Sequence, residues 1–178
     1  MKKIILVLIL IGLLFTSFKL INIHKNTDSS KTSKLNKSNK GKLQMHLKEV
    51  QELANANSKY NNEIAFFIDM KIPSGKNRFY IYDLKNNKLI DEGLVAHGSG
   101  SETQVAGILK FSNTNNSFCT SLGKYSIENS YVGKFGKAYK LFGLDATNSN
   151  AFDRNIVLHT YFDVPYEEQE VPICNSLG

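Results

Sequence analysis

The stretch IAFFIDMKIPSGKNRFYIYD, residues 64–83, contains two runs in which side chains of different character alternate along the chain. The runs, 64–70 and 78–83, are separated by residues 73–75, whose sequence Pro-Ser-Gly is typical of a turn. A period of two indicates a β-strand, because successive side chains point to opposite faces of a sheet. The stretch therefore predicts two strands joined by a turn.

Further short strands are predicted toward the C-terminus. The adjacent residues Asn86 and Asn87 favour a hairpin between the run that ends at Asp83 and a strand at 88–91. Other apolar runs are bounded by Gly and Asn, and they predict strands at 93–96, 123–127, 140–144 and 156–160. Residues 148–154 are expected to form one helical turn.

A helix is predicted before the first strand. Leu43, Leu47, Val50 and Leu53 recur at helical spacing, which favours an amphipathic helix over residues 43–57 that packs on the domain. One helix followed by many short strands indicates a mainly β domain, with a sandwich or barrel-like sheet and an N-terminal helix.

The first 23 residues have the pattern of an export signal or a membrane anchor. Lys2 and Lys3 precede an apolar run from Ile4 to Phe18, which is short for a membrane span of about 20 residues. Lys19 is followed by more apolar residues and could extend the span, and no small-x-small cleavage site is evident. Residues 1–23 are therefore expected to be a cleaved signal peptide or an anchor. The rest would be exported to the periplasm or the outer face of the cytoplasmic membrane.

The positive charge of the chain is confined to its N-terminal part. Residues 1–42 carry nine lysines and one aspartate, whereas residues 43–178 carry thirteen Lys or Arg and fifteen Asp or Glu. A nucleic-acid-binding fold should carry its basic residues on the folded domain, so no nucleic-acid partner is expected. Residues 24–42, rich in Lys, Ser, Asn and Thr, are predicted to be a flexible basic linker. Its lysines either contact anionic membrane or wall polymer or simply keep the linker solvated.

Most motifs for metals and cofactors are missing from the sequence. No cluster of His, Cys and Asp has metal-ligand spacing and no Gly-rich phosphate loop occurs, so neither a metal nor a cofactor is expected. His97 begins the small flexible turn His-Gly-Ser-Gly-Ser, and on its own such a histidine is most often structural. Cys119 and Cys174 are too few for a disulfide framework, and whether they pair in an oxidising compartment is left open.

Two segments near the end of the chain suggest catalysis. Residues 156–160, Ile-Val-Leu-His-Thr, place His159 at the end of an apolar strand, where packing would hold a general base rigidly. The chain ends with Cys-Asn-Ser-Leu-Gly at 174–178, so that Ser176 and Gly178 frame a short turn.

Together these segments resemble the signature of the L,D-transpeptidases, the YkuD-like family, in which a histidine at a strand end precedes Ser-x-Gly-Cys. Sixteen residues separate His159 from Ser176, within the range of the family. Other similar segments follow in the same order along the chain, and they are 68–74, 78–84, 95–101, 111–113, 121–125 and 141–144. The resemblance covers roughly residues 60–178 and is to the murein L,D-transpeptidase catalytic domain.

This resemblance implies the YkuD-like fold and acyl transfer in the cell wall. A cysteine thiolate would attack the L,D peptide bond of a peptidoglycan stem tetrapeptide, form a thioester, and pass the acyl group to an amine of a neighbouring stem. By resemblance, His159 would activate the cysteine, the backbone carbonyl of Thr160 would orient the imidazole, and Ser176 and Gly178 would shape the oxyanion turn. Residues expected to line the substrate groove are Ser121, Gly123 and Tyr125.

The sequence departs from the family at its last residue. The nucleophilic cysteine is expected directly after Gly178, and the sequence ends there. Three interpretations follow: residues 43–178 are a truncated catalytic domain that is inactive as given, Cys174 serves as the nucleophile, or the chain is a non-catalytic wall-binding relative. An L,D-carboxypeptidase, in which water replaces the acceptor amine, is a further alternative. Cys119 is expected to be a small buried or disulfide-bonded residue.

Overall fold

The computed structural model describes residues 4–10 and 43–177, and that part of the chain contains one α-helix, one short 3-10 helix (Ser99–Ser101) and seven strands. The strands form one hydrogen-bonded sheet in the order β4-β3-β2-β1-β5-β6-β7. The helix spans residues 43–56. The strands are β1 (Ile4–Leu10), β2 (Tyr60–Asp69), β3 (Phe79–Asp83), β4 (Lys88–Gly93), β5 (Gly123–Gly133), β6 (Gly136–Gly143) and β7 (Val157–His159).

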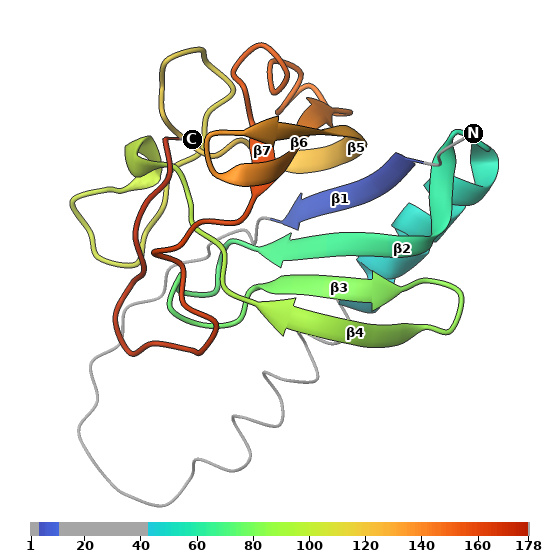
Figure 1. Cartoon of the computed structure of the whole chain (residues 1–178), viewed down its shortest axis with the longest axis horizontal. Coiled ribbons are helices and arrows are strands. Elements are labelled where there is room, and N and C mark those ends of the chain that lie inside the picture. The colour runs from blue at the N-terminus through green and yellow to red at the C-terminus, as the bar shows by residue number, and fades with distance from the viewer. Residues whose placement is uncertain (1–3, 11–42, 178) are drawn as a thin grey trace, which may run out of the picture.

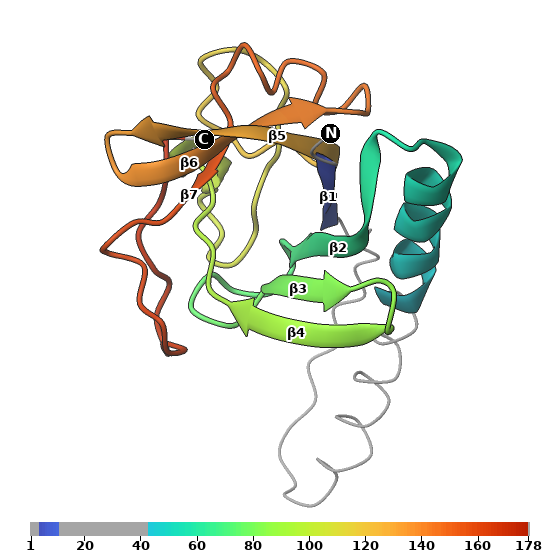
Figure 2. The same cartoon turned by 45° about the vertical axis from the view of Figure 1, so that its right-hand side comes forward.

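The sheet has two antiparallel halves joined by β1. One half is β4-β3-β2 and the other is β5-β6-β7, while β1 pairs parallel to β2 and antiparallel to β5. The two halves lie one above the other, with β1 between them (Figures 1 and 2). The predicted architecture, a mainly β domain with an N-terminal helix, is therefore confirmed.

The helix covers the outer face of the β2-β3 half. Leu47, Val50 and Ala54 recur on one side of it and are buried in a cluster with Ala65 and Phe67 of β2. These helix positions are the apolar stripe expected from the sequence, so the helix forms because its stripe can be buried against β2 and β3.

The second core lies on the other face of β2, between the two halves of the sheet. Ile68 contributes from β2, while Tyr125, Ile127 and Leu141 contribute from β5 and β6. Because β2 carries apolar side chains in both alternating positions, it is buried on both faces, and the sheet halves enclose this second core.

Several element boundaries differ from the prediction. β5 continues beyond residue 127 to Gly133, with an irregularity between Ile127 and Ser130, and forms a long hairpin with β6. Residues 94–97 follow β4 without joining the sheet, so the separate strand predicted at 93–96 is wrong. Residues 148–154 form consecutive turns, and the bond from the Arg154 N–H to the Asn150 carbonyl at 2.9 Å closes the single helical turn that was expected there.

The N-terminal predictions concern residues of which only Ile4–Leu10 are described. The structure places this run in strand β1, whereas the rest of the expected signal or anchor and the linker 24–42 lie outside the described residues. Within the described ranges, no helix is long and apolar enough to cross a membrane.

Candidate active site

His159 stands at the end of β7, the strand at one edge of the sheet. It is held in register by pairing with Ala138 of β6 and is half-buried. Its Nδ1 lies 2.8 Å from the carbonyl oxygen of Thr160. A carbonyl can only accept a hydrogen bond, so this contact places the proton of a neutral imidazole on Nδ1 and leaves the lone pair on Nε2. The geometry is that of a histidine prepared to take up a proton through Nε2.

Phe135 supports the imidazole ring from the hairpin between β5 and β6. Its ring is stacked on His159 with a centroid separation of 5.2 Å and an interplanar angle of 15°. Tyr161 contacts Phe135 edge-on, with centroids 5.0 Å apart. The turn that carries Phe135 is two residues long, and Gly136 adopts a φ of 90°, a conformation that glycine tolerates best. The orientation of His159 is thus restrained at Nδ1 and on one ring face.

The C-terminal segment, residues 167–177, crosses the connection between β2 and β3 before it approaches the site. Gln169 donates its N–H to the carbonyl of Gly75 over 2.7 Å, and a Cβ at Gly75 would collide with the carbonyl oxygens of Gln169 and Val171. Lys76 forms an ion pair with Glu170 at 2.8 Å. The close backbone approach explains why glycine is needed at this turn.

Ser176 is bound to the segment that follows β4. Its N–H donates to the carbonyl of His97 at 2.8 Å, and its carbonyl accepts from the N–H of Ser99 at 2.8 Å. The two bonds form a parallel bridge between Gly98 and Ser176. Gly178 lies outside the described residues. The start of the expected Ser-x-Gly turn is therefore fixed by residues 97–99.

His97 is buried, and both of its ring nitrogens have hydrogen-bond partners, unlike the flexible turn expected from the sequence. Its Nδ1 lies 2.9 Å from Nη2 of Arg78, and its Nε2 lies 2.6 Å from Oε1 of Glu102. Residues Ser99–Ser101 form a 3-10 turn, and Thr120 donates its N–H to the buried Ser101 hydroxyl. Burial lowers the pKa of Arg78 to about 10, while the charges of Asp69 and Glu102 act in the opposite direction.

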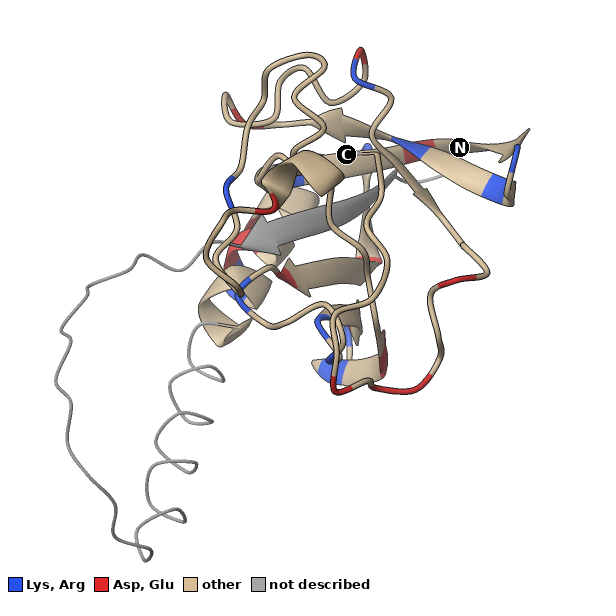
Figure 3. Cartoon of the chain, turned by 90° about the vertical axis from the view of Figure 1, so that its left-hand side faces the viewer, with Lys and Arg blue, Asp and Glu red and all other residues tan. Residues whose placement is uncertain are grey.

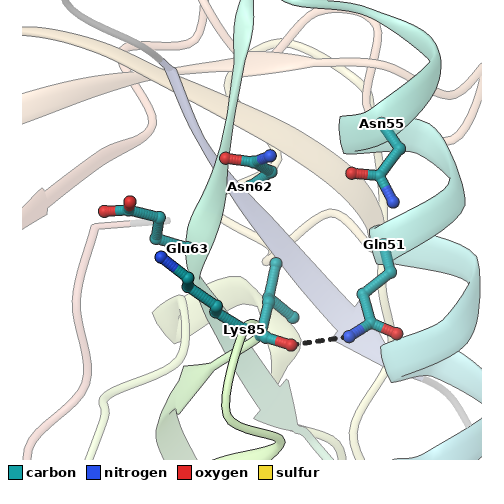
Figure 4. A pocket seen from close by; sticks show the side chains of 6 residues that line it. Gln51, Asn55, Asn62, Glu63 and Lys85 are labelled. Atoms are coloured by element: carbon teal, nitrogen blue, oxygen red, sulfur yellow. Dashed lines mark hydrogen bonds between the residues drawn. The ribbon is translucent and has the colours of Figure 1, made fainter.

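The cavity shown in Figure 4 is separate from His159. It has a volume of about 340 Å³ and lies between the helix and the segments around the start of β2 and the end of β3, with Gln51 donating to the carbonyl of Leu84. The edge strand β7 is at the other end of the sheet order from β3 and β4. Acidic and basic residues are interspersed on the view in Figure 3, and the described residues contain no group of three or more potential metal ligands.

Comparison with known families identifies the fold. The profile of the L,D-transpeptidase catalytic domain, YkuD-like, matches residues 34–178. The chain belongs to the L,D-transpeptidase catalytic domain family. No curated protein and no solved structure matches it. The matched residues include both antiparallel halves of the sheet, His159 in β7, and Ser176 in the C-terminal segment.

Two thiols lie in the described part of the L,D-transpeptidase domain, and both are free. Cys119 is buried and donates to the carbonyl of Gly100 at 3.0 Å, in accord with a structural role. Burial, and next the charge of Asp163, raise the pKa of Cys174. Among the described contacts, none is a hydrogen bond between Cys174 and His159. This environment disfavours the thiolate form that a nucleophile needs, so Cys174 is a poor substitute for the family cysteine.

Two of the three residues expected to line the substrate groove of the L,D-transpeptidase domain, Ser121 and Tyr125, lie in its interior, whereas Gly123 is partly exposed. Ser121 and Tyr125 are 1% and 0% exposed, and their side-chain oxygens are 2.7 Å apart. Tyr125 also donates to the Ser121 carbonyl at 2.7 Å. Gly123 has a φ of 133°, and a Cβ there would meet the side chains of Asp145 and Asn148. The burial of Ser121 and Tyr125 and the hydrogen bonds between them disfavour contact with a substrate, and the groove assignment of all three residues stays a prediction.

Three residues around the site were not singled out from the sequence: Arg78, Glu102 and Phe135. Arg78 and His97 fall within segments that resemble the family, and an arginine inside an alternating strand pattern was a signal that it could be paired in the interior. No local pattern indicates that Phe135 faces His159, because their contact depends on the register of β6 with β7.

Proposed function

We propose that this domain catalyses L,D-transpeptidation, the acyl transfer that cross-links peptidoglycan stem peptides, with His159 as the general base. The observation that carries the proposal is the placement of His159 in a chain of this family: Nδ1 is engaged by Thr160, and Nε2 is the nitrogen left to take a proton. Restraint by Phe135 limits the rotation of the ring, which favours efficient proton transfer.

The nucleophile in this proposal is a cysteine thiolate at the position after Gly178. The thiol proton passes to Nε2 of His159, and the resulting thiolate attacks the carbonyl carbon of the L,D bond. The C–N bond then breaks to leave a thioester, and the imidazolium returns the proton to the amine of the departing D-amino acid. An amine of a second stem then attacks the thioester carbonyl and gives one proton to Nε2 of His159, so that the amide cross-link forms, the C–S bond breaks and the cysteine sulfur is released. Backbone amides of the turn that begins at Ser176 would stabilise the tetrahedral oxyanion.

The proposed place of action is outside the cytoplasmic membrane, where peptidoglycan is accessible. The supporting sequence feature is the lysine pair followed by the apolar run 4–18, which is typical of an exported chain. Attachment to the membrane through residues 1–23 is part of the same proposal, and it requires Ile4–Leu10 to leave the β1 position between β2 and β5.

Intact-mass spectrometry tests the proposal. The chain is compared with a version that carries one cysteine added after Gly178, each incubated with a muropeptide that has a tetrapeptide stem. We expect the extended chain to gain the mass of the peptide without its terminal D-amino acid. His159→Ala should abolish this adduct, whereas His46→Ala, a partly buried histidine on the helix, should leave it unchanged. An adduct that persists in His159→Ala would refute the assignment of the base.

The products separate the related functions. Cross-linked dimers support transpeptidation, whereas tripeptide stems without cross-links indicate an L,D-carboxypeptidase. A non-catalytic wall-binding role is the competing proposal, and the observation that favours it is that neither described thiol has a nucleophile's environment. Binding of the muropeptide without any adduct in the extended chain would support that role and refute acyl transfer.

A further inference from the structure

Next to the bridge between Gly98 and Ser176, three polar side chains are hydrogen-bonded in series: Arg78 to His97, and His97 to Glu102. Arg78 is fully buried and His97 is 4% exposed, whereas the side chain of Glu102 is 45% exposed. Arg78 is fixed by hydrogen bonds to the carbonyls of Val95 and Ile72, three in all, with distances from 2.6 to 3.1 Å. These bonds fix the position of the buried guanidinium of Arg78, which in turn restrains the imidazole of His97 that it contacts.

The direction of the hydrogen bonds defines the tautomer of His97. Arg78 can only donate, so Nδ1 of His97 accepts, and a neutral ring then carries its proton on Nε2. That proton is donated to the carboxylate of Glu102 over 2.6 Å. His97 is thus the reverse of His159, whose Nδ1 faces a carbonyl and carries the proton. The ring of His97 has no nitrogen left for substrate, so a direct role in proton transfer is unsuited to it.

The backbone of His97 transmits this restraint to the site. Its carbonyl accepts from Ser176, and two residues later Ser99 donates to the Ser176 carbonyl. Hydrogen bonds therefore hold both the ring and the backbone carbonyl of His97. Glu102 follows the 3-10 turn that begins at Ser99. A movement of the His97 ring would therefore move the edge to which Ser176 is bound.

We propose that Arg78, His97 and Glu102 form a positioning network that holds Ser176, and with it the start of the Ser-x-Gly turn, in place. Packing alone does not require these residues, because apolar groups of the same shape can replace both partners of a buried hydrogen bond with little change in stability. What the polar network adds is a single orientation for the segment 97–99. The value of that orientation for catalysis rests on the proposed function, but the network itself is tested without turnover.

Amide hydrogen exchange of the 178-residue chain, followed by NMR, tests the proposal. Glu102→Ala removes the acceptor of the Nε2 proton at a partly exposed position, where the variant is expected to fold. We expect the Ser176 and Ser99 amides to exchange roughly tenfold faster, because opening of the bridge becomes easier, while Leu141 in β6 is unchanged. Glu102→Gln keeps a side-chain acceptor and should restore most of the protection.

The matched control is Glu170→Ala, which removes another exposed carboxylate from a cationic partner, Lys76, on the same C-terminal segment. It should leave the Ser99 amide unaffected. Unchanged exchange of Ser176 and Ser99 in Glu102→Ala would overturn the proposal, and so would equal acceleration of Leu141, which would indicate a general loss of stability.

Nitrogen chemical shifts of the imidazoles provide a second readout. The proposal expects the Nε2–H tautomer for His97 and the Nδ1–H tautomer for His159 in the unmodified chain at a pH where both are neutral. An Nδ1–H tautomer for His97 would contradict the bond from Arg78 and overturn the network. Failure of the muropeptide assay would leave these results intact, so the two proposals fail separately.

Discussion

Replacing Tyr125 by phenylalanine tests whether this tyrosine belongs to the interior, as the structure indicates, or to a substrate groove. The hydroxyl of Tyr125 donates to the Ser121 carbonyl and receives a hydrogen bond from the Ser121 hydroxyl, each at 2.7 Å. Both residues are almost completely buried. Tyr125→Phe therefore leaves two buried polar groups of Ser121 without this partner, since no water replaces the hydroxyl in a closed interior.

The expected loss follows from the number of groups left unsatisfied. At about 1–2 kcal/mol for each, the free energy of unfolding should fall by roughly 2–4 kcal/mol. For a domain of this size, 1 kcal/mol corresponds to about 2–4 °C, so the melting temperature should fall by roughly 4–16 °C. The double variant with Ser121→Ala removes one of the orphaned groups, so its loss should be smaller than the sum of the two single losses.

Urea unfolding followed by circular dichroism measures these differences, because the chain has no tryptophan for fluorescence. Tyr139→Phe is the control, since Tyr139 in β6 is half-buried and its described contact is between its ring and Lys137. A Tyr125→Phe variant with unchanged stability but weakened muropeptide binding would refute the interior assignment and restore the groove prediction.

Four further changes have defined outcomes. Phe67 lies on β2, faces the helix and is 1% exposed, so Phe67→Ala should lower the free energy of unfolding in urea by about 3–5 kcal/mol. Burial raises the pKa of Tyr125, so at high pH the unfolded state loses this proton before the folded state does. The free energy of unfolding should therefore decline above about pH 10, and less steeply in Tyr125→Phe, as urea titrations at rising pH would show. Phe135→Leu should lower the rate of adduct formation by the cysteine-extended chain roughly tenfold and shift the ring-proton NMR signals of His159, whereas a change in binding alone would contradict the stacking argument. Deletion of residues 1–10 should produce concentration-dependent association in light scattering, because β2 and β5 each lose a paired edge; a stable monomer would contradict this.

The predictable parts of the structure are those set by local periodicity. Leu47, Val50 and Ala54 define the buried stripe of the helix, and the alternation in 64–70 and 78–83 defines two neighbouring antiparallel strands. His159 could be placed at a strand end from its apolar neighbours alone. In each case the side chains that signal the element are also the ones that it buries.

The parts that could not be predicted depend on pairing between distant segments. His97 acquires its role only because β3 presents Arg78 to it and the C-terminal segment presents Ser176, and neither neighbour is close in sequence. Tyr125 occupies the interior because β5 lies between β1 and β6, which an alternating pattern in β5 does not reveal. Periodicity tells which side chains share a face, whereas register decides what that face meets.

Ile4–Leu10 is the case in which one pattern satisfies two physical requirements. Seven consecutive apolar residues fit the apolar region of an export signal, and they also fit a strand in the middle of a sheet. The structure shows the second arrangement, in which β1 joins the two halves of the sheet through β2 and β5. The same residues cannot lie in a membrane or be removed and also fill this position. If export withdraws them, the edges of β2 and β5 facing each other become a site for another strand, so the N-terminal segment and the completeness of the sheet are coupled.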